Sequence, residues 1–142
     1  MPWQVQVRQD MPVIETWYSG VLSPAELNAA ASETLDQARA HSRGLLLADC
    51  TTLAGGHSVF DLFDLAEAVR ASDMGFVVRE AVILPKLPAQ AEVAEFWETT
   101  SRNKGLQVRL FADRKSAIGW LLQQAEQRTK PQETKATDRP MP

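Results

Sequence analysis

Apolar and polar residues alternate at the start of the chain. Trp3, Val5 and Val7 would share one side of an extended chain, and the residues between them are polar, which predicts a strand with one solvated face. Turn-forming residues 9–12 separate this strand from a second apolar stretch at residues 13–18. We therefore predict that the chain opens with an antiparallel hairpin.

Four later segments carry apolar residues at helical spacing. The first opens with Ser23-Pro24-Ala25-Glu26, which combines a capping box with a proline suited to the first helical position. Three further helix starts are marked by the pair Ser58 and Asp61, by Pro88, and by Asp113. The expected core-facing residues are Leu27, Ala30, Ala31, Thr34, Leu35 and Ala38; Leu62, Leu65, Ala66 and Val69; Val93, Phe96, Trp97 and Thr100; and Ala117, Trp120, Leu121 and Gln124.

Three more strands are predicted between these helices. Residues 45–48 are uninterruptedly apolar, which is typical of a central strand covered on both faces, and a polar loop is expected at residues 49–57. Gly75 is the expected end of the second helix, and residues 76–84 contain the next strand, which includes residues 81–84. Residues 106–110 alternate as an edge strand does. The order ββαβαβαβα predicts an α/β fold with a mixed, mostly parallel five-stranded sheet and about four helices.

Composition limits the domain organisation. The chain has 142 residues, of which 44% are apolar, enough for one core and too few for two. Residues 1–127 are expected to form that single domain. Residues 128–142 are rich in proline and charge and contain no aromatic side chain, so we predict a disordered C-terminal tail.

Several classes of site and partner are disfavoured by composition. The net charge of −3 argues against nucleic-acid binding, and one cysteine excludes an internal disulfide or a cysteine-built zinc site. No glycine-rich nucleotide motif is present, so no cofactor is expected. No apolar run approaches the roughly 18 residues of a membrane span, and the first residues lack a secretory signal. We expect a cytoplasmic protein.

The loop after the central strand is the main candidate site. In open parallel sheets, ligands bind beyond the carboxyl ends of the strands. There, Asp49, His57 and Ser58 are expected beside Lys86 of a neighbouring loop, and a helix N-terminus at Ser58 favours anions. The simpler interpretation, which we weigh above this one, is that Ser58 only caps its helix.

Two other features admit a functional and a structural interpretation. Cys50 with His57 suggests a thiol enzyme, but a cysteine ending a buried strand is usually a small hydrophobic residue. The aromatic residues of the second and third helices are expected to pack mainly in the core, and Phe63 is expected to pack beside the core-facing residues of the second helix. Phe60 exceeds what its helix stripe needs, and a spare aromatic near a loop indicates a partner surface. The affected aromatics are Phe60, Phe63, Phe76, Phe96 and Trp97.

The pattern resembles a known family. Gly44-Leu-Leu-Leu-Ala-Asp49, followed by a loop and a helix, is similar to the central strand and switch loop of STAS domains, the anti-sigma-factor-antagonist fold of SpoIIAA. The ending Leu106-Gln-Val-Arg-Leu-Phe-Ala-Asp-Arg-Lys-Ser-Ala-Ile-Gly-Trp-Leu121 is similar to the last strand and helix of the SpoIIAA-like, STAS/SEC14-type branch of small bacterial proteins. The resemblance covers roughly residues 3–125.

The resemblance implies a function without catalysis. It suggests a regulatory or binding module that engages a protein partner around Ser58, or else a SEC14-like carrier of a small apolar or lipid-like ligand. In antagonist members a serine at this position is phosphorylated, within an Asp-Ser-Ser-Gly-like stretch. Here the stretch reads His57-Ser58-Val59-Phe60 and lacks both the preceding acid and the following glycine. Phosphorylation of Ser58 is therefore an expectation from position alone.

Overall fold

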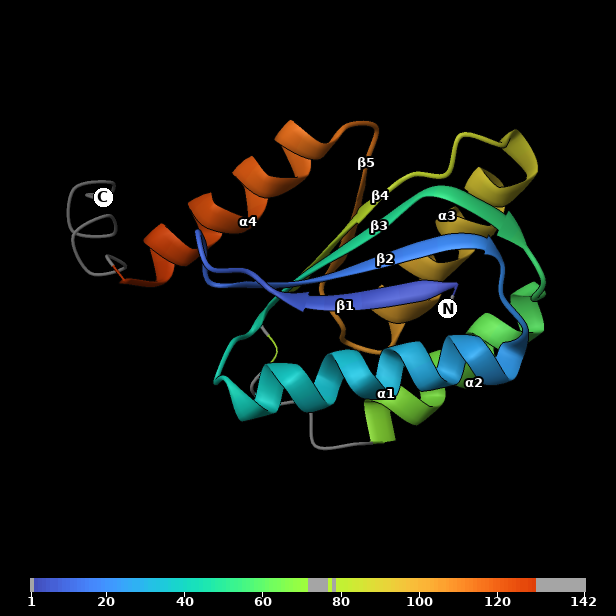
Figure 1. Ribbon diagram of the computed structural model, residues 1–142, viewed down its shortest axis with the longest axis horizontal. Coiled ribbons are helices and arrows are strands. Elements are labelled where there is room, and N and C mark those ends of the chain that lie inside the picture. Colours follow the sequence, from blue (N-terminus) through green and yellow to red (C-terminus); the bar gives the residue numbers. More distant parts are fainter. Residues whose placement is uncertain (1, 72–76, 78, 130–142) are drawn as a thin grey trace.

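The computed structural model describes residues 2–71, 77 and 79–129, with side chains up to residue 123 (Figure 1). Its described part is a five-stranded sheet with four helices, in the predicted order. The strands lie in the order β1-β2-β3-β4-β5, with β1 antiparallel to β2 and the others parallel. The elements are β1 (Trp3–Val7), β2 (Val13–Val21), α1 (Pro24–Ala40), β3 (Leu45–Gly55), α2 (Val59–Ala71), β4 (Arg79–Ile83), α3 (Pro88–Asn103), β5 (Val108–Phe111) and α4 (Arg114–Thr129).

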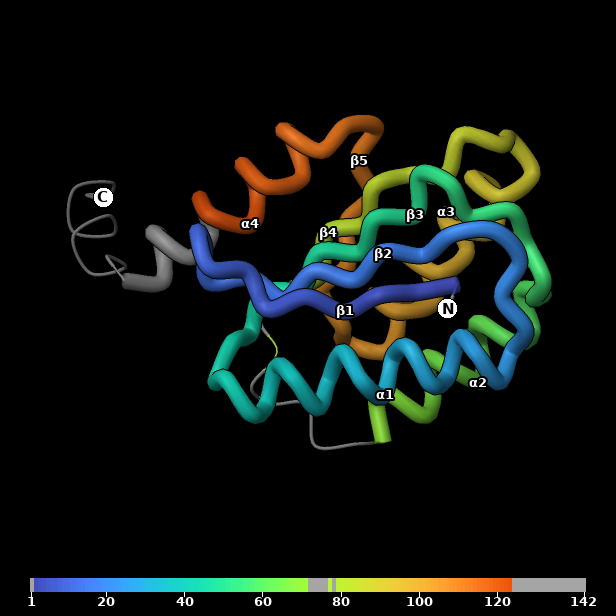
Figure 2. The backbone as a smooth tube through the Cα atoms, viewed as in Figure 1, coloured from blue at the N-terminus to red at the C-terminus, as the bar shows by residue number. Residues whose placement is uncertain are grey.

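The helices form unequal layers on the two faces of the sheet. Each parallel strand is added beside the previous one, and right-handed crossovers that all step in one direction place their helices on one face. Thus α1, α2 and α3 cover one face and α4 the other (Figures 1 and 2). Helix α2 packs mainly against α3, and α4 packs on β3, β4 and β5.

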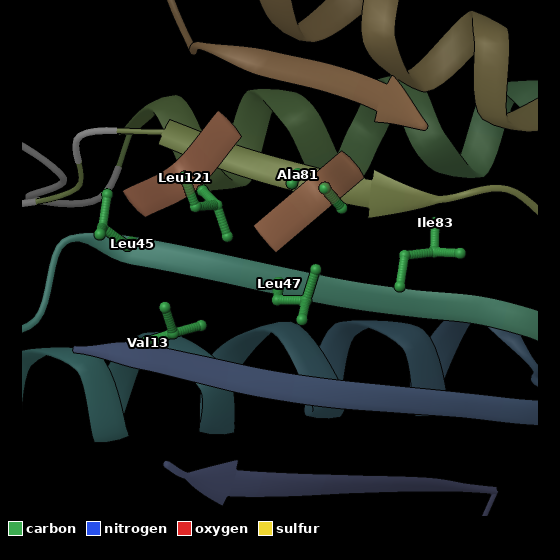
Figure 3. Packing of buried hydrophobic residues seen from close by; sticks show 7 residues of the cluster. Val13, Leu45, Leu47, Ala81, Ile83 and Leu121 are labelled. Atoms are coloured by element: carbon green, nitrogen blue, oxygen red, sulfur yellow. The ribbon is translucent and has the colours of Figure 1, made fainter. Parts of the chain in front are cut away.

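Strand alternation divides the core between these layers. On the α4 side, Leu45 and Leu47 of β3 pack with Ala81 and Ile83 of β4 and with Leu121 of α4 (Figure 3). The intervening residues of β3 and β4 face α1, α2 and α3. β3 is therefore covered on both faces, as its uninterrupted apolar start predicts.

The predicted helix starts and edge strand are confirmed. Ser23 caps α1 through a complete capping box with Glu26, and Pro24 is the first helical residue. Pro88 begins α3, and β5 lies at the edge of the sheet.

The predicted polar loop at residues 49–57 is wrong over most of its length. β3 continues to Gly55, because its polar residues keep pairing with β2, which itself runs three residues beyond the predicted end at Tyr18. Trp17 pairs with Asp49 and Val21 with Gly55, across two register shifts. The hydrogen bonds of this long ladder outweigh the polar composition.

Three predictions fall partly or wholly outside the described residues. The helix stop at Gly75 and the aromatic Phe76 lie there. Of the predicted tail, residues 128 and 129 belong to α4, and residues 130–142 lie outside.

Candidate functional site

A cavity of about 580 Å³ lies between the sheet and helices α1, α2 and α3. Because α2 packs mainly on α3, its apolar stripe also faces this space rather than only the strands. Leu46 and Leu53 both line the cavity and lie seven positions apart on β3, so it extends on the order of 20 Å along the strand. Its apolar wall includes Leu27, Ala31, Leu35, Leu46, Ala48, Leu53, Leu62, Leu65, Val69, Val82, Val93, Ala94, Leu106 and Val108.

Among the residues that the structure describes, Glu80 is the only carboxylate in the wall of this cavity. Alternation along β4 turns Ala81 and Ile83 toward α4 and Glu80 toward the cavity. Glu80 Oε1 accepts a hydrogen bond of 3.1 Å from Trp97 Nε1 of α3. Burial raises the pKa of the Glu80 carboxyl to about 7, and the bond from Trp97 opposes this rise. Near neutral pH the cavity therefore contains a carboxyl group that is only partly ionised.

Tyr18 of β2 and Cys50 of β3 lie on the same cavity wall as Glu80, but farther toward the carboxyl ends of the strands, since Glu80 pairs with Leu46. Both line the cavity, and both pack with Trp97 beside the same buried residues, Ala48, Val82 and Val108. Burial raises the pKa of the Tyr18 hydroxyl and of the Cys50 thiol, and the charge of Glu80 adds to both shifts. Glu80, Tyr18, Cys50 and Trp97, which we call the Glu80 cluster, thus combine one ionisable carboxyl with two aromatic rings and a thiol.

The Cys50 thiol is not arranged as a nucleophile. A reactive cysteine needs a lowered pKa and a base within hydrogen-bond reach, whereas burial raises the pKa of Cys50. His57 Nδ1 lies instead 3.3 Å from the carbonyl oxygen of Leu22. The structure thus agrees with the interpretation of Cys50 as a small hydrophobic residue.

Three of the predicted edge residues lie together where α2 begins. Ser58 caps the helix through a reciprocal pair with Asp61: the Ser58 N–H donates to Oδ2 at 2.7 Å, and Ser58 Oγ accepts from the Asp61 N–H at 3.3 Å. His57 lines the end of the cavity, and Phe60 is 79% exposed. The spare aromatic is therefore on the surface. Phe63, predicted to pack beside the stripe, is instead 44% exposed, with Lys104 Nζ 4.4 Å from its ring centroid.

The other two predicted residues are placed differently. Lys86 is exposed and follows the carboxyl end of β4, and its N–H donates to the carbonyl oxygen of Thr51 in β3. Asp49 lies on the α4 side of β3, away from the cavity; its Oδ1 accepts from the Thr51 N–H, and its Oδ2 pairs with Arg114 at 3.3 Å. Asp49 thus accepts a local N–H, and it does not join His57 and Ser58.

Asp49 belongs to a charged cluster on the α4 side of the sheet. Glu15 of β2 is fully buried, and its Oε1 pairs with both Arg8 at 2.5 Å and Arg114 at 2.6 Å. Arg114 bridges Glu15 to Asp49 and so ties the start of α4 to the sheet.

Within residues 2–71, 77 and 79–129, no three His, Cys, Asp or Glu side chains are grouped to hold a metal ion. No helix in the same ranges combines the length and apolarity that would let it cross a membrane.

Sequence reasoning did not identify Glu80 as a site residue. One signal was available: Glu80 directly precedes the apolar run of β4, at a position that strand alternation places on a covered face. Tyr18 and Trp97 were assigned only to a strand and a core stripe, because their meeting depends on how α3 crosses the sheet.

Comparisons with known proteins show the fold. No protein-family model matches the chain, and no curated protein does. The chain is similar to the crystal structure of an uncharacterised protein of the DUF3478 family, with a SpoIIAA-like fold, from Shewanella loihica PV-4. The two share 19% sequence identity with a TM-score of 0.54, over 84% of this chain and 91% of that one. The predicted SpoIIAA-like fold is therefore confirmed.

Proposed function

We propose that this SpoIIAA-like protein is a non-catalytic binding module that holds one small, elongated, mainly apolar molecule in the cavity. The cavity itself carries the proposal. Protein cores are close-packed, with few voids larger than a water molecule, whereas ligand pockets occupy about 300–1,000 Å³ and combine apolar walls with a few polar groups. A volume of about 580 Å³ around the Glu80 cluster fits the second description.

The absence of a catalytic arrangement around the cavity supports a carrier or sensor rather than an enzyme. Among the described residues that line it, Cys50 has a raised pKa and His57 is directed to a backbone carbonyl. Glu80 has no second titratable group placed as its acid–base partner in the wall, since Tyr18 and Cys50 both hold their protons at neutral pH.

Filling the cavity should abolish binding of an apolar probe. Ala31 of α1 and Ala94 of α3 both line it, so the double variant Ala31→Phe with Ala94→Phe places two rings in the space. We expect the neutral fluorescent probe N-phenyl-1-naphthylamine to bind the wild type at one site, and the double variant at least about ten-fold more weakly. Fluorescence titration measures both affinities.

A matched control separates cavity filling from a general effect of added rings. Ala29 and Ala68 lie on exposed faces of α1 and α2, so Ala29→Phe with Ala68→Phe adds the same two rings outside the cavity. This control should bind the probe like the wild type. Equal affinity in all three proteins would show that the probe binds elsewhere and would contradict the proposal.

A protein partner at the start of α2 is a second candidate function, favoured by one observation. Phe60 at 79% and Val21 at 66% exposure are large apolar side chains at the same end of the sheet, and Gly56, beside Val21, leads into α2. Exposed aromatics of this kind serve as anchors at protein interfaces. Phosphorylation of Ser58 would place negative charge at this surface, where the helix N-terminus tolerates it.

Substitutions at this surface should change binding without unfolding the protein. Aspartate is itself a good N-cap, so Ser58→Asp is expected to lower the free energy of unfolding by about 1 kcal/mol or less, and Phe60→Ala removes little buried area. Affinity capture from the native host, followed by mass spectrometry, would compare both variants with the wild type. A partner lost by both supports the second function; identical partner profiles for all three proteins exclude it.

A further inference from the structure

We propose, building on the cavity-binding function above, that the Glu80 cluster recognises an ammonium group at one end of an apolar ligand. The preferred ligand class is then an alkylamine or a related cationic amphiphile, with its tail directed along β3 toward Leu53.

The Glu80 carboxylate has capacity for a ligand. Among the described residues, its one hydrogen-bond partner is Trp97, which donates to Oε1. Glu80 Oε2 has no hydrogen-bond partner among the described residues, and it is not fully enclosed by protein atoms. It therefore faces the cavity that Glu80 lines. An isolated carboxylate in an apolar space is unfavourable unless it is protonated or paired with a cation. A ligand ammonium supplies that cation.

Among the described residues, no cation pairs with the Glu80 carboxylate, although Arg79 and His57 also line the cavity. The neighbouring Arg79 guanidinium lies over the Trp120 ring, 4.8 Å from its centroid, on the α4 side of the sheet. His57 lies at the carboxyl end of the strands, whereas Glu80 pairs with Leu46 near their start. The rise in the pKa of Glu80 agrees with this, since desolvation causes it and no cation counteracts it.

The groups around the carboxylate suit an ammonium rather than an anion or a neutral head. The Trp97 indole contacts Glu80 through its Nε1–H, the Tyr18 ring lines the same cavity, and aromatic rings attract cations. At the far end of the cavity, Gln90 Oε1 is buried without a hydrogen-bond partner and offers another acceptor. A carboxylate ligand would meet a like charge at Glu80.

Three probes with the same ten-carbon tail separate the head group from the cavity. Isothermal titration calorimetry at pH 8 would compare decylammonium and decanoate, each below its micellar concentration, with decanol below its solubility limit. For the wild type we expect decylammonium to bind at least about ten-fold more tightly than decanol, and decanoate most weakly. Glu80→Gln keeps the shape and the acceptor for Trp97. It should weaken decylammonium about ten-fold while leaving decanol within about two-fold. Glu95→Gln, on the exposed side of α3, is the matched control and should behave like the wild type.

A pH profile tests the charge directly. Decyltrimethylammonium has a fixed charge, so its affinity should rise between pH 6 and pH 8 as Glu80 ionises, and Glu80→Gln should remove the rise. The other titratable groups near Glu80, Tyr18 of β2 and Cys50 of β3, stay protonated in this range because burial raises their pKa values. The other described charged or titratable residues of the wall are Arg79, whose guanidinium lies over Trp120, and His57, at the opposite end of the cavity from Glu80. The facing side chains of α1, α2 and α3 are Thr34, Gln90, Trp97 and a set of apolar residues.

The outcomes distinguish this inference from the proposed function. If decanol binds in the cavity while decylammonium shows no preference and Glu80→Gln changes nothing, ammonium recognition is wrong and the apolar cavity function stands. If none of the three probes binds, both are wrong. If decanoate binds most tightly, Glu80 acts as a protonated donor to a carboxylate, and the ammonium inference is overturned.

Discussion

Between pH 4.5 and pH 7, the ligand-free wild-type protein is expected to lose about 2–3 kcal/mol of unfolding free energy relative to Glu80→Gln. In the unfolded chain, Glu80 titrates at its ordinary pKa of 4.5, whereas burial in the cavity raises the folded-state pKa to about 7. The folded state therefore binds the proton more tightly. Its stabilising effect is complete below the unfolded pKa and is lost as the pH rises through the folded pKa.

Urea denaturation at four pH values across this range measures the effect. Glutamine resembles the protonated carboxyl, so the difference between the two proteins isolates the titration of Glu80. The exposed carboxylates Asp10, Glu67 and Asp113, whose pKa values are lowered by hydrogen-bond partners, act equally in both proteins and at lower pH. If the unfolding free energies of the wild type and Glu80→Gln changed in parallel with pH, Glu80 would not be desolvated in the folded protein. The cavity would then lack the buried carboxyl group that we describe.

Gly56→Ala should destabilise the protein by about 3–5 kcal/mol. Gly56 joins β3 to α2 with φ +101°, a conformation that L side chains rarely adopt. A Cβ there would lie 2.3 Å from the Leu22 carbonyl oxygen and 2.7 Å from its carbon, so the backbone must move. The same shift would displace His57 and the start of α2 at the end of the cavity.

Gly20→Ala is the matched control for this substitution. Gly20 also has a positive φ, of +72°, but a Cβ there meets nothing within 4 Å. Its replacement should cost about 1 kcal/mol, the backbone penalty alone. Chemical denaturation gives both values. Equal losses would mean that the close approach of Gly56 to Leu22 adds nothing, and that this turn does not hold the end of the cavity in place.

Local sequence signals were sufficient to predict the elements of the fold. The reciprocal cap of Ser23 and Glu26, the proline at residue 88 and the apolar start of β3 are each set by residues close in sequence. The length of β3 was not predictable in the same way. Its second half depends on pairing with β2 across two register shifts, and that partner is about 30 residues away.

The candidate site was predicted only in part, for a similar reason. Ser58 as a cap and Phe60 as a spare aromatic follow from helix periodicity. The cavity arises because α2 leans on α3 and not directly on the strands, and no local pattern encodes that spacing. The role of Glu80 depends on its hydrogen bond from Trp97, which lies on another element, and no local sequence pattern indicates that contact.

Native mass spectrometry of the freshly purified protein tests the claim that the cavity between the sheet and α1, α2 and α3 holds a small molecule. For the wild type, we predict the mass of the chain plus one small molecule, which is released on denaturation. For the double variant Ala31→Phe with Ala94→Phe, we predict the mass of the chain alone. The bare mass for both proteins, together with failure of the wild type to bind N-phenyl-1-naphthylamine, would contradict the claim.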